Sequence, residues 1–248
     1  MHIELLTATF LKRYKRFLAD VRLKDGSEIT VHCPNSGSMK TLLTSGVACA
    51  IHDSGNAQRK YRYTLTLMGL AEPLVDSNRF KPVQPHWALV DTQRPNAMVE
   101  EAILAGQIPE LSNYSSLRRE VAYGTEKSRI DLLLESPHRP PCYVEVKNNT
   151  MLSSEVAGRS DFPDAVTTRG QKHLRELTAM TQQGARAVMF YLVNRSDVHS
   201  CGIAERIDPD YAKALREAMA SGVEVLCYQS VLSLTELRMG RKLHFDFI

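Results

Sequence analysis

Residues 128–149, SRIDLLLESPHRPPCYVEVKNN, contain two apolar segments separated by a proline-rich turn. Apolar residues surround Asp131 in the first segment, and they surround Glu145 and Lys147 in the second. This pattern predicts two short strands joined by a turn. Residues two apart on a strand share a face, so Glu145 and Lys147 point the same way. If the strands are neighbours, Asp131 lies within reach of both.

Two carboxylates and one ammonium at the edge of an apolar sheet are costly to desolvate unless they are paired, hydrated or metal-bound. The carboxylates of Asp131 and Glu145 are the hard oxygen ligands that Mg²⁺ or Mn²⁺ takes, and Lys147 can orient water or stabilise negative charge. An Asp followed after a hairpin by Glu-x-Lys resembles the PD-(D/E)xK nuclease superfamily. An ion-paired edge hairpin with no chemical role is the alternative that the same residues allow.

The composition is that of an ordinary globular protein, with 43% hydrophobic and 24% charged residues among 248. The chain has no apolar run long enough for a membrane span, so we expect no membrane partner. Its basic cluster follows the first apolar residues, which is the wrong order for a secretion signal. The five cysteines are scattered. We therefore expect reduced thiols, a cytoplasmic location and no zinc site.

The basic residues are concentrated in the N-terminal third of the chain. Residues 1–80 hold 11 Lys and Arg against 7 Asp and Glu, an excess of 4. The remaining residues hold 31 − 11 = 20 basic and 28 − 7 = 21 acidic side chains, within an overall net charge of +3. Such asymmetry is typical of proteins that bind polyanions. It is also typical of proteins whose basic surface is simply exposed to water.

Residues 1–85 predict a first domain that is rich in β-strands. Asp25-Gly26 is a strong hairpin signal between two of its strands. Short strands with turn signals and little helix favour a small barrel, and an OB-like barrel that binds nucleic acid is one candidate. The expected strands cover residues 17–23, 28–33, 47–52 and 62–70.

Two clusters in this domain interleave basic and aromatic side chains. Such clusters can bind nucleic acid, because aromatic rings stack on bases while Lys and Arg contact phosphates. In the alternative interpretation the rings face the core and the charges face water. The candidate nucleic-acid-binding residues are Lys12, Arg13, Lys15 and Arg16 in the first cluster, and Arg59, Lys60 and Arg62 in the second.

Residues 86–248 predict a second domain in which strands and helices alternate, with a mixed central sheet. Asn96 is expected to cap a helix that runs to about residue 105 and carries Glu100 and Glu101, one of which can face the hairpin. Residues 152–164 are expected to form a loop. The other expected elements are strands at 118–123, 186–193 and 223–228, and helices from about 166 to 182 and at 210–220.

Five longer motifs resemble the sugar fermentation stimulation protein A (SfsA) family and follow one another along nearly the whole chain. The resemblance implies an OB-like barrel followed by a PD-(D/E)xK nuclease-like domain. It also implies DNA binding without marked sequence preference and a regulatory role in sugar (maltose) metabolism. The motifs are HCPNSGSM (32–39), SRIDLLLE (128–135), CYVEVKN (142–148), FPDAVTTRGQKHLREL (162–177) and IDPDYAKALREA (207–218).

The resemblance carries a set of site residues over to this chain. It implies a catalytic group formed by Glu101, Asp131, Glu145, Lys147 and Gln171, with Asp131 and Glu145 as the metal ligands. Arg169, Lys172 and His173 are expected to contact phosphate, and Asp164 is expected to cap the helix that follows it. Three functions remain open: a DNA-binding regulator, an active metal-dependent DNA or RNA nuclease, and a non-catalytic interaction protein. The sequence predicts no oligomeric state.

Overall fold

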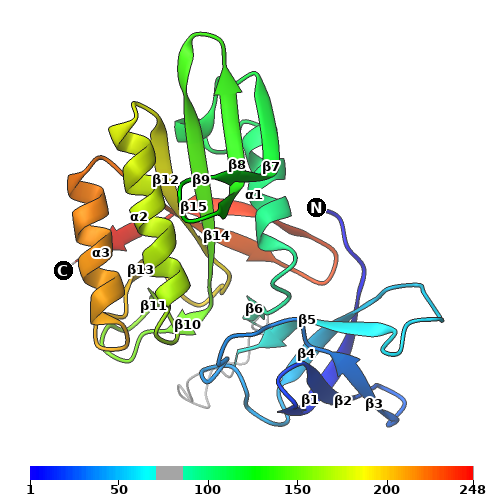
Figure 1. Ribbon diagram of the computed structural model, residues 1–248. Helices are drawn as coiled ribbons and strands as arrows, with labels where there is room; N and C mark the ends of the chain where they lie inside the picture. The colour runs from blue at the N-terminus through cyan, green and yellow to red at the C-terminus, as the bar shows by residue number, and fades with distance from the viewer. Residues whose placement is uncertain (71–85, 248) are drawn as a thin grey trace.

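The structure is a computed structural model that describes residues 1–70 and 86–247. Figure 1 shows a β-rich N-terminal domain packed beside an α/β domain in which helices cover a central sheet. In the described residues, no helix has the length and hydropathy needed to cross a bilayer. All five cysteines are free and buried.

The N-terminal domain is a six-stranded sheet that curls into a barrel. Its strand order is β3-β2-β1-β4-β5-β6, and a parallel bridge between His32 and Thr64 joins β3 to β5. Side chains that alternate along the strands, such as Phe10 and Val21, fill its interior. The expected OB-like barrel is confirmed. Its strands are β1 (Leu5–Tyr14), β2 (Leu18–Arg22), β3 (Glu28–His32), β4 (Ala48–Asp53), β5 (Tyr63–Gly69) and β6 (Trp87–Leu89).

Two features of the barrel were not expected from the sequence. The first basic cluster begins within β1, a strand that the sequence reasoning did not assign. β6 pairs with β5, so the N-terminal sheet includes residues beyond the expected boundary at residue 85.

The α/β domain is built on a mixed sheet with the order β15-β14-β12-β9-β8-β7. The three central strands β9, β12 and β14 are parallel, and the strands on either side are antiparallel. The expected mixed sheet is therefore confirmed. Its elements are α1 (Pro95–Leu104), η1 (Pro109–Leu111), β7 (Ser116–Tyr123), β8 (Ser128–Ser136), β9 (Arg139–Asn149), α2 (Thr168–Gln182), β12 (Arg186–Val193), α3 (Pro209–Ala220), β14 (Glu224–Leu232) and β15 (Leu237–Lys242).

The helices lie on opposite faces of this sheet (Figure 1). Met98 of α1 packs in the same core as Phe190, whereas Leu174 and Leu177 of α2 pack with Met189 on the other face. The parallel strands β9, β12 and β14 therefore have apolar residues on both sides, as expected for strands covered by helices.

A second, four-stranded sheet lies at the end of β9. It has the order β10-β11-β13-β16. The expectation of a loop over residues 152–164 is wrong, because β11 pairs in parallel with β13 and in antiparallel fashion with β10. The strands are β10 (Met151–Leu152), β11 (Arg159–Phe162), β13 (Ser200–Ile203) and β16 (His244–Asp246).

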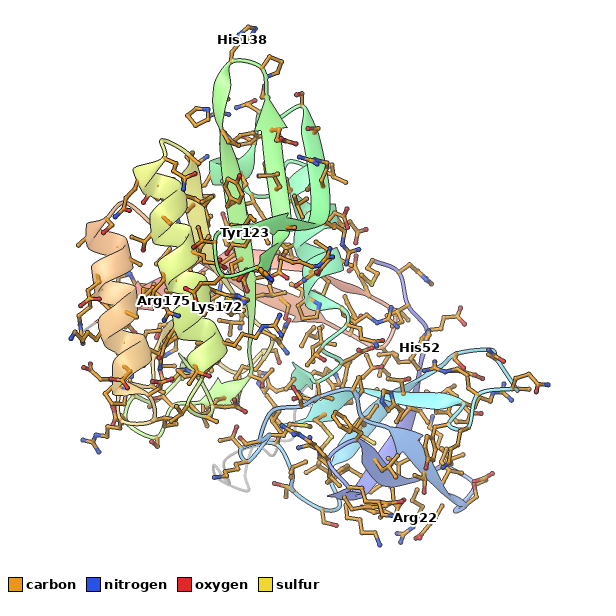
Figure 2. The ribbon with its side chains drawn as sticks, viewed as in Figure 1. Arg22, His52, Tyr123, His138, Lys172 and Arg175 are labelled. Carbon is orange, nitrogen blue, oxygen red and sulfur yellow. The ribbon has the colours of Figure 1, made fainter. Side chains whose placement is uncertain are left out.

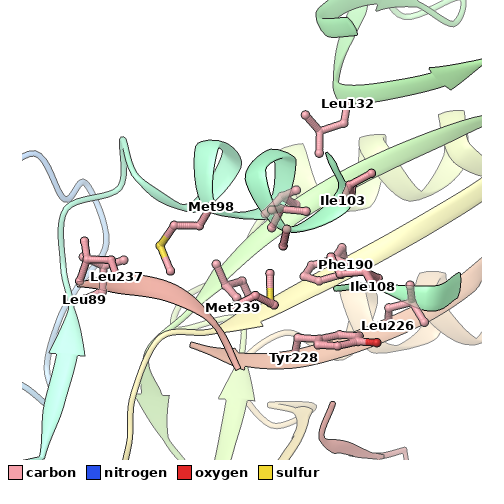
Figure 3. Packing of buried hydrophobic residues seen from close by; sticks show 14 of the residues in the cluster. Leu89, Met98, Ile103, Ile108, Leu132, Phe190, Leu226, Tyr228, Leu237 and Met239 are labelled. Atoms are coloured by element: carbon pink, nitrogen blue, oxygen red, sulfur yellow. The ribbon is translucent and has the colours of Figure 1, made fainter. Parts of the chain in front are cut away.

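One hydrophobic core continues from the barrel into the α/β domain. Leu67 and Leu89 of the barrel belong to the same buried cluster as Met98 and Leu237. Figure 3 shows Leu89 beside Leu237, with Met98 nearby. Burial of apolar surface is worth roughly 25 cal/mol per Å², so this contact holds the two domains together as one body.

Candidate functional site

The site forms where β8 and β9 separate. Leu133 of β8 lies opposite Tyr143 of β9, and the same antiparallel register places Asp131 opposite Glu145. At this position the Asp131 side chain takes the place of a backbone acceptor on β8, because Asp131 Oδ2 accepts a 2.8 Å hydrogen bond from the Val146 amide of β9. The carboxylate of Asp131 is thus held between the two strands.

Glu145, Lys147 and His173 form a buried group beside this gap. Lys147 Nζ lies 2.8 Å from Glu145 Oε1 and 3.3 Å from His173 Nδ1. His173 Nδ1 also makes a direct hydrogen bond to Glu145 Oε1. Arg169 Nε donates to His173 Nε2 over 3.3 Å. Figure 2 shows α2, with Lys172 and Arg175 labelled, lying beside the strands that carry this group.

The two carboxylates lie in different electrostatic environments. Burial, together with the charge of Glu145, raises the pKa of Asp131 to about 6. Burial also tends to raise the pKa of Glu145, but the charges and hydrogen bonds of Lys147 and His173 outweigh it and lower that pKa below its usual range. At neutral pH both groups are therefore anionic, although Asp131 ionises at a cost.

The residues present fit a divalent cation. Glu145 is 3% exposed, and its Oε2 atom is buried without a hydrogen-bond partner among the described residues. No three His, Cys, Asp or Glu side chains of the described residues gather into a complete metal cage. Two carboxylates without a cage are typical of Mg²⁺, which keeps several waters and takes its other ligands from substrate phosphate.

Asn96 is a site residue that the sequence reasoning assigned to another role. It was expected to cap α1, but α1 begins at Pro95 and Arg94 occupies the cap position. The Asn96 amide instead donates to Asp131 Oδ1 over 2.7 Å. The sequence signal for this role was the position of Asn96 at the start of the helix that precedes the two strands of the site.

The expectation that Glu101 and Gln171 lie in the site is wrong. Glu101 is 56% exposed, and its carboxylate pairs with the N-terminal amine of Met1 at 2.9 Å. The phase of α1 explains the error, since Glu100 rather than Glu101 follows Asn96 by four residues on the same face. Gln171 Nε2 donates to Asp208 Oδ1 over 3.2 Å, at the start of α3.

His173, two residues after Gln171, occupies the place that Gln171 was expected to fill. Sequence reasoning treated it as a contributor to phosphate contacts rather than as a partner of Glu145. A helix places residues two apart on different faces, so only the exact phase of α2 distinguishes these two side chains.

Arg13, Lys12 and Arg62 of the basic clusters make polar contacts with other parts of the barrel domain. Arg13 has a structural role, because its guanidinium donates to the carbonyls of Asn35 at 2.6 Å and Gly37 at 3.0 Å. Lys12 pairs with Asp20 at 3.5 Å, and Arg62 forms two-point contacts with Asp53.

The other basic side chains lie in three places. Lys15 and Arg16 form the β1–β2 turn with left-handed backbone, φ 47° and 64°, and Arg16 donates to the Ser36 carbonyl over 3.2 Å. The hairpin tip between β4 and β5 carries Arg59 and Lys60 and projects away from α2 in Figure 1. Lys172 of α2 donates to the Glu126 carbonyl.

Asp164 connects the two domains rather than capping α2. Its Oδ2 atom accepts hydrogen bonds from the Ser38 amide at 2.9 Å and the Ser38 hydroxyl at 3.0 Å. Thr167 is the cap of α2, and its side chain accepts from the Gly170 amide. The expectation of a capping role for Asp164 is therefore wrong.

An OB barrel joined to a mixed α/β domain, with Asp on one strand and Glu-x-Lys on the next, defines a two-domain protein of the PD-(D/E)xK nuclease-like class. Residues 11–75 match the SfsA N-terminal OB domain, and residues 93–236 match the sugar fermentation stimulation protein RE domain. The chain belongs to the SfsA family.

The similarity to curated and solved relatives extends over almost the whole chain. A sugar fermentation stimulation protein homolog from Shewanella sp. (strain MR-4) is 48% identical over 93% of this chain and 92% of its own. The homolog from Shewanella frigidimarina is 49% identical over the same shares. The SfsA of Pyrococcus furiosus, solved in complex with Ca²⁺, is 25% identical, with a TM-score of 0.82 over 99% of this chain and 98% of that one.

Proposed function

We propose that this protein binds DNA without marked sequence preference and that its PD-(D/E)xK site, with a divalent cation bound, hydrolyses phosphodiester bonds. One observation carries the proposal: the buried Glu145 carboxylate has an oxygen, Oε2, that lacks a hydrogen-bond partner within residues 1–70 and 86–247 and lies next to an ammonium and a second carboxylate. A buried anion with an unused acceptor is costly unless a cation or water completes it.

Each residue of the site has a distinct task in this proposal. Asp131 and Glu145 would hold Mg²⁺ or Mn²⁺, which when bound polarises the phosphoryl group and acidifies a bound water. Asn96 and the Val146 amide fix both oxygens of Asp131, and His173 fixes the Glu145 carboxylate. Lys147 presents its ammonium beside these carboxylates, where it can orient the attacking water and stabilise charge on the phosphate.

The expected partner is DNA, and basic side chains near the boundary between the two domains support it. Lys15 and Arg16 project from the β1–β2 turn, next to the loop at Ser36 that faces the α/β domain. The relative from Pyrococcus furiosus was solved with Ca²⁺, which supports a divalent cation in this chain as well. Contacts from Lys and Arg to phosphates fix position without reading sequence.

Two measurements on one pair of variants test the proposal. Calorimetry with Ca²⁺ measures the metal site, and incubation of single-stranded, duplex and branched DNA with Mg²⁺ or Mn²⁺ measures cleavage. Asp131→Ala should weaken Ca²⁺ binding by more than about 10- to 100-fold, which is the cost of removing even a residue that only orients a metal ligand, and abolish cleavage. Glu101→Ala is the matched control, because the Glu101 carboxylate is exposed and pairs with the N-terminal amine of Met1. Equal Ca²⁺ affinity in the Asp131 variant and wild type would contradict the metal site.

A second function is DNA binding without turnover. It is favoured by the position of Lys147, which is 13% exposed and is already held by Glu145 and His173. In that case Ca²⁺ binds and DNA binds, but no DNA or RNA form is cut in Mg²⁺ or Mn²⁺. A role in maltose metabolism rests on the family, and comparing maltose growth of cells that carry wild type or Asp131→Ala tests whether that role needs the site.

A further inference from the structure

A cavity of about 430 Å³ lies between the two domains, outside the Asp131–Glu145 site. Its volume is within the range of about 300–1,000 Å³ that ligand pockets occupy. Lys40 and Asp164 stand among its polar lining residues. The apolar part of its lining is Met39, Met151, Leu152, Ala165, Ala204 and Ile207.

A second cavity of about 170 Å³ adjoins the larger one. It is lined by Asn148 and Asn149, which directly follow Lys147 on β9, and it shares Thr150, Met151 and Asp164 with the larger cavity. An extended chain covers about 3.3 Å per residue, so Met151, which lines the larger cavity four residues after Lys147, lies at most about 13 Å from it. A DNA strand bound at the site can therefore reach the larger cavity within a few nucleotides.

The wall that the barrel contributes is held in place before any ligand binds. Arg13 donates to the carbonyls of Asn35 and Gly37, and the Asn35 amide donates to the carbonyl of Val90 over 3.2 Å. Ser38 is bound to Asp164 of the opposite wall. A preorganised wall lowers the ordering cost of binding.

Two arginines at or next to the larger cavity are paired, whereas Lys40 and one oxygen of Asp164 have no partner among the described residues. Arg206 pairs with Glu155 at 2.6 Å, and Arg159 pairs with Asp161 at 2.6 Å. Lys40 has no ion-pair partner among the residues that the structure describes, so its charge remains for a ligand. Asp164 uses Oδ2 for Ser38, and within the same residues Oδ1 accepts no hydrogen bond.

We propose that the larger cavity binds an unpaired nucleotide of the DNA strand that passes the Asp131–Glu145 site. Met39, Met151 and Ile207 provide apolar walls against which an extruded base can pack. Asp164 Oδ1 accepts from an amino or imino group of the base, and Lys40 contacts a phosphate. This inference rests on the proposed function and adds a substrate class to it: DNA that has a single-stranded segment a few nucleotides from the site.

Filling the cavity with one side chain tests the inference. Ala165 is an exposed residue that lines the cavity, so Ala165→Trp occupies it without disturbing a core. Val166, the next residue, is 67% exposed and does not line it, so Val166→Trp is the matched control. The measurement is fluorescence anisotropy with one labelled DNA oligonucleotide, single-stranded or paired with its complement, in Ca²⁺ so that the strand stays intact.

Wild type and Val166→Trp should bind the single strand in preference to the duplex. Ala165→Trp should lose about 10- to 150-fold in single-strand affinity, as expected when one large apolar group can no longer be buried, and keep its duplex affinity. Ser154→Trp, which fills the same cavity from an exposed position, should behave in the same way if Ala165→Trp fails to fold. The inference is overturned if these variants leave the ratio of single-strand to duplex affinity unchanged, or if Val166→Trp changes it equally.

The Ca²⁺ affinity of the same variants separates this inference from the metal site. Ala165→Trp should bind Ca²⁺ as wild type does, because Asp131 and Glu145 do not line the larger cavity. If Asp131→Ala binds Ca²⁺ normally while Ala165→Trp loses single-strand preference, the proposed metal site fails and the nucleotide cavity stands. If Asp131→Ala loses Ca²⁺ affinity while Ala165→Trp keeps the single-strand preference, the proposed metal site stands and the nucleotide-binding cavity is refuted.

Discussion

The carboxylate of Glu145 on β9 and the imidazole of His173 on α2 are joined by a direct hydrogen bond in the interior of the protein. Both side chains are buried, at 3% and 6% exposure. A helix on one face of the sheet therefore fixes the orientation of a carboxylate on the central strand. Neighbours that orient a ligand in this way commonly matter nearly as much as the ligand itself.

Replacing His173 tests whether it positions Glu145. His173→Ala should lower Ca²⁺ affinity by about 10- to 100-fold, because the carboxylate loses its fixed orientation. His173→Asn should retain most of the affinity, since its amide nitrogen can take the place of Nδ1, and His173→Gln should not. Gln171→Ala is the control, because Gln171 binds Asp208 rather than Glu145. Wild-type Ca²⁺ affinity in His173→Ala, measured by calorimetry, would show that the contact is not needed.

Asp131→Asn should change how stability depends on pH in the absence of metal. The pKa of Asp131 in the folded protein is raised from 3.8 to about 6, so its protonated form stabilises the fold below about pH 4 and this contribution is lost as pH rises through 6. The loss is of the order of 3 kcal/mol. Relative to wild type, the Asn variant should therefore gain stability between pH 4 and pH 7.

Urea unfolding in EDTA across this pH range measures the difference between the two proteins. Wild type with Ca²⁺ should recover the lost stability at neutral pH, because the cation binds only the folded site. A difference between Asp131→Asn and wild type that stays constant from pH 4 to pH 7 would contradict the raised pKa.

The two basic clusters should contribute unequally to DNA binding. Lys15 and Arg16 lie next to the loop at Ser36 that lines the smaller cavity, whereas the hairpin tip with Arg59 and Lys60 projects away from α2. Replacing Lys15 and Arg16 together by Ala should reduce the salt dependence of DNA binding by up to about 2 in log–log slope. The matched double replacement of Arg59 and Lys60 removes the same charge and should change the slope less. Equal effects would place both clusters on the DNA.

Arg13 should matter for stability rather than for DNA. Its guanidinium bonds the carbonyls of Asn35, Gly37 and Ser38, so Arg13→Ala leaves three acceptors without their charged donor. A loss of about 2–3 kcal/mol in the free energy of unfolding is expected. Lys12→Ala, which removes a neighbouring exposed ion pair, should cost less than about 1 kcal/mol. Urea unfolding compares the two variants, and equal losses would contradict the structural role of Arg13.

The sequence predicted the architecture where the hydrophobic pattern was regular. The alternation around Asp131 and the apolar run of β12 each identified a strand, and the longer helices α2 and α3 were found from their apolar faces. The strands of the small sheet were not found, because β10, β11 and β16 have only two to four residues. Such strands become recognisable only through their partners.

The site was predicted as a pattern but not in all its side chains. Asp131, Glu145 and Lys147 follow from spacing along two strands, and the structure brings them together. Asn96 and His173 come from helices, where a change of one residue rotates a side chain by about 100°. The bonds of Arg13 to a loop more than 20 residues away depend on tertiary folding, so its basic neighbours concealed its role.

The continuous core that includes Leu67, Leu89, Met98 and Leu237 prevents a hinge motion between the two domains. Because the barrel cannot swing toward the α/β domain without opening that core, the distance between the two domains is fixed. Under the proposed function, DNA must fit this fixed space through its own flexibility, which favours strands that bend or come unpaired. Either domain made alone would expose the apolar residues of the shared core to water, so neither is expected to be stable by itself.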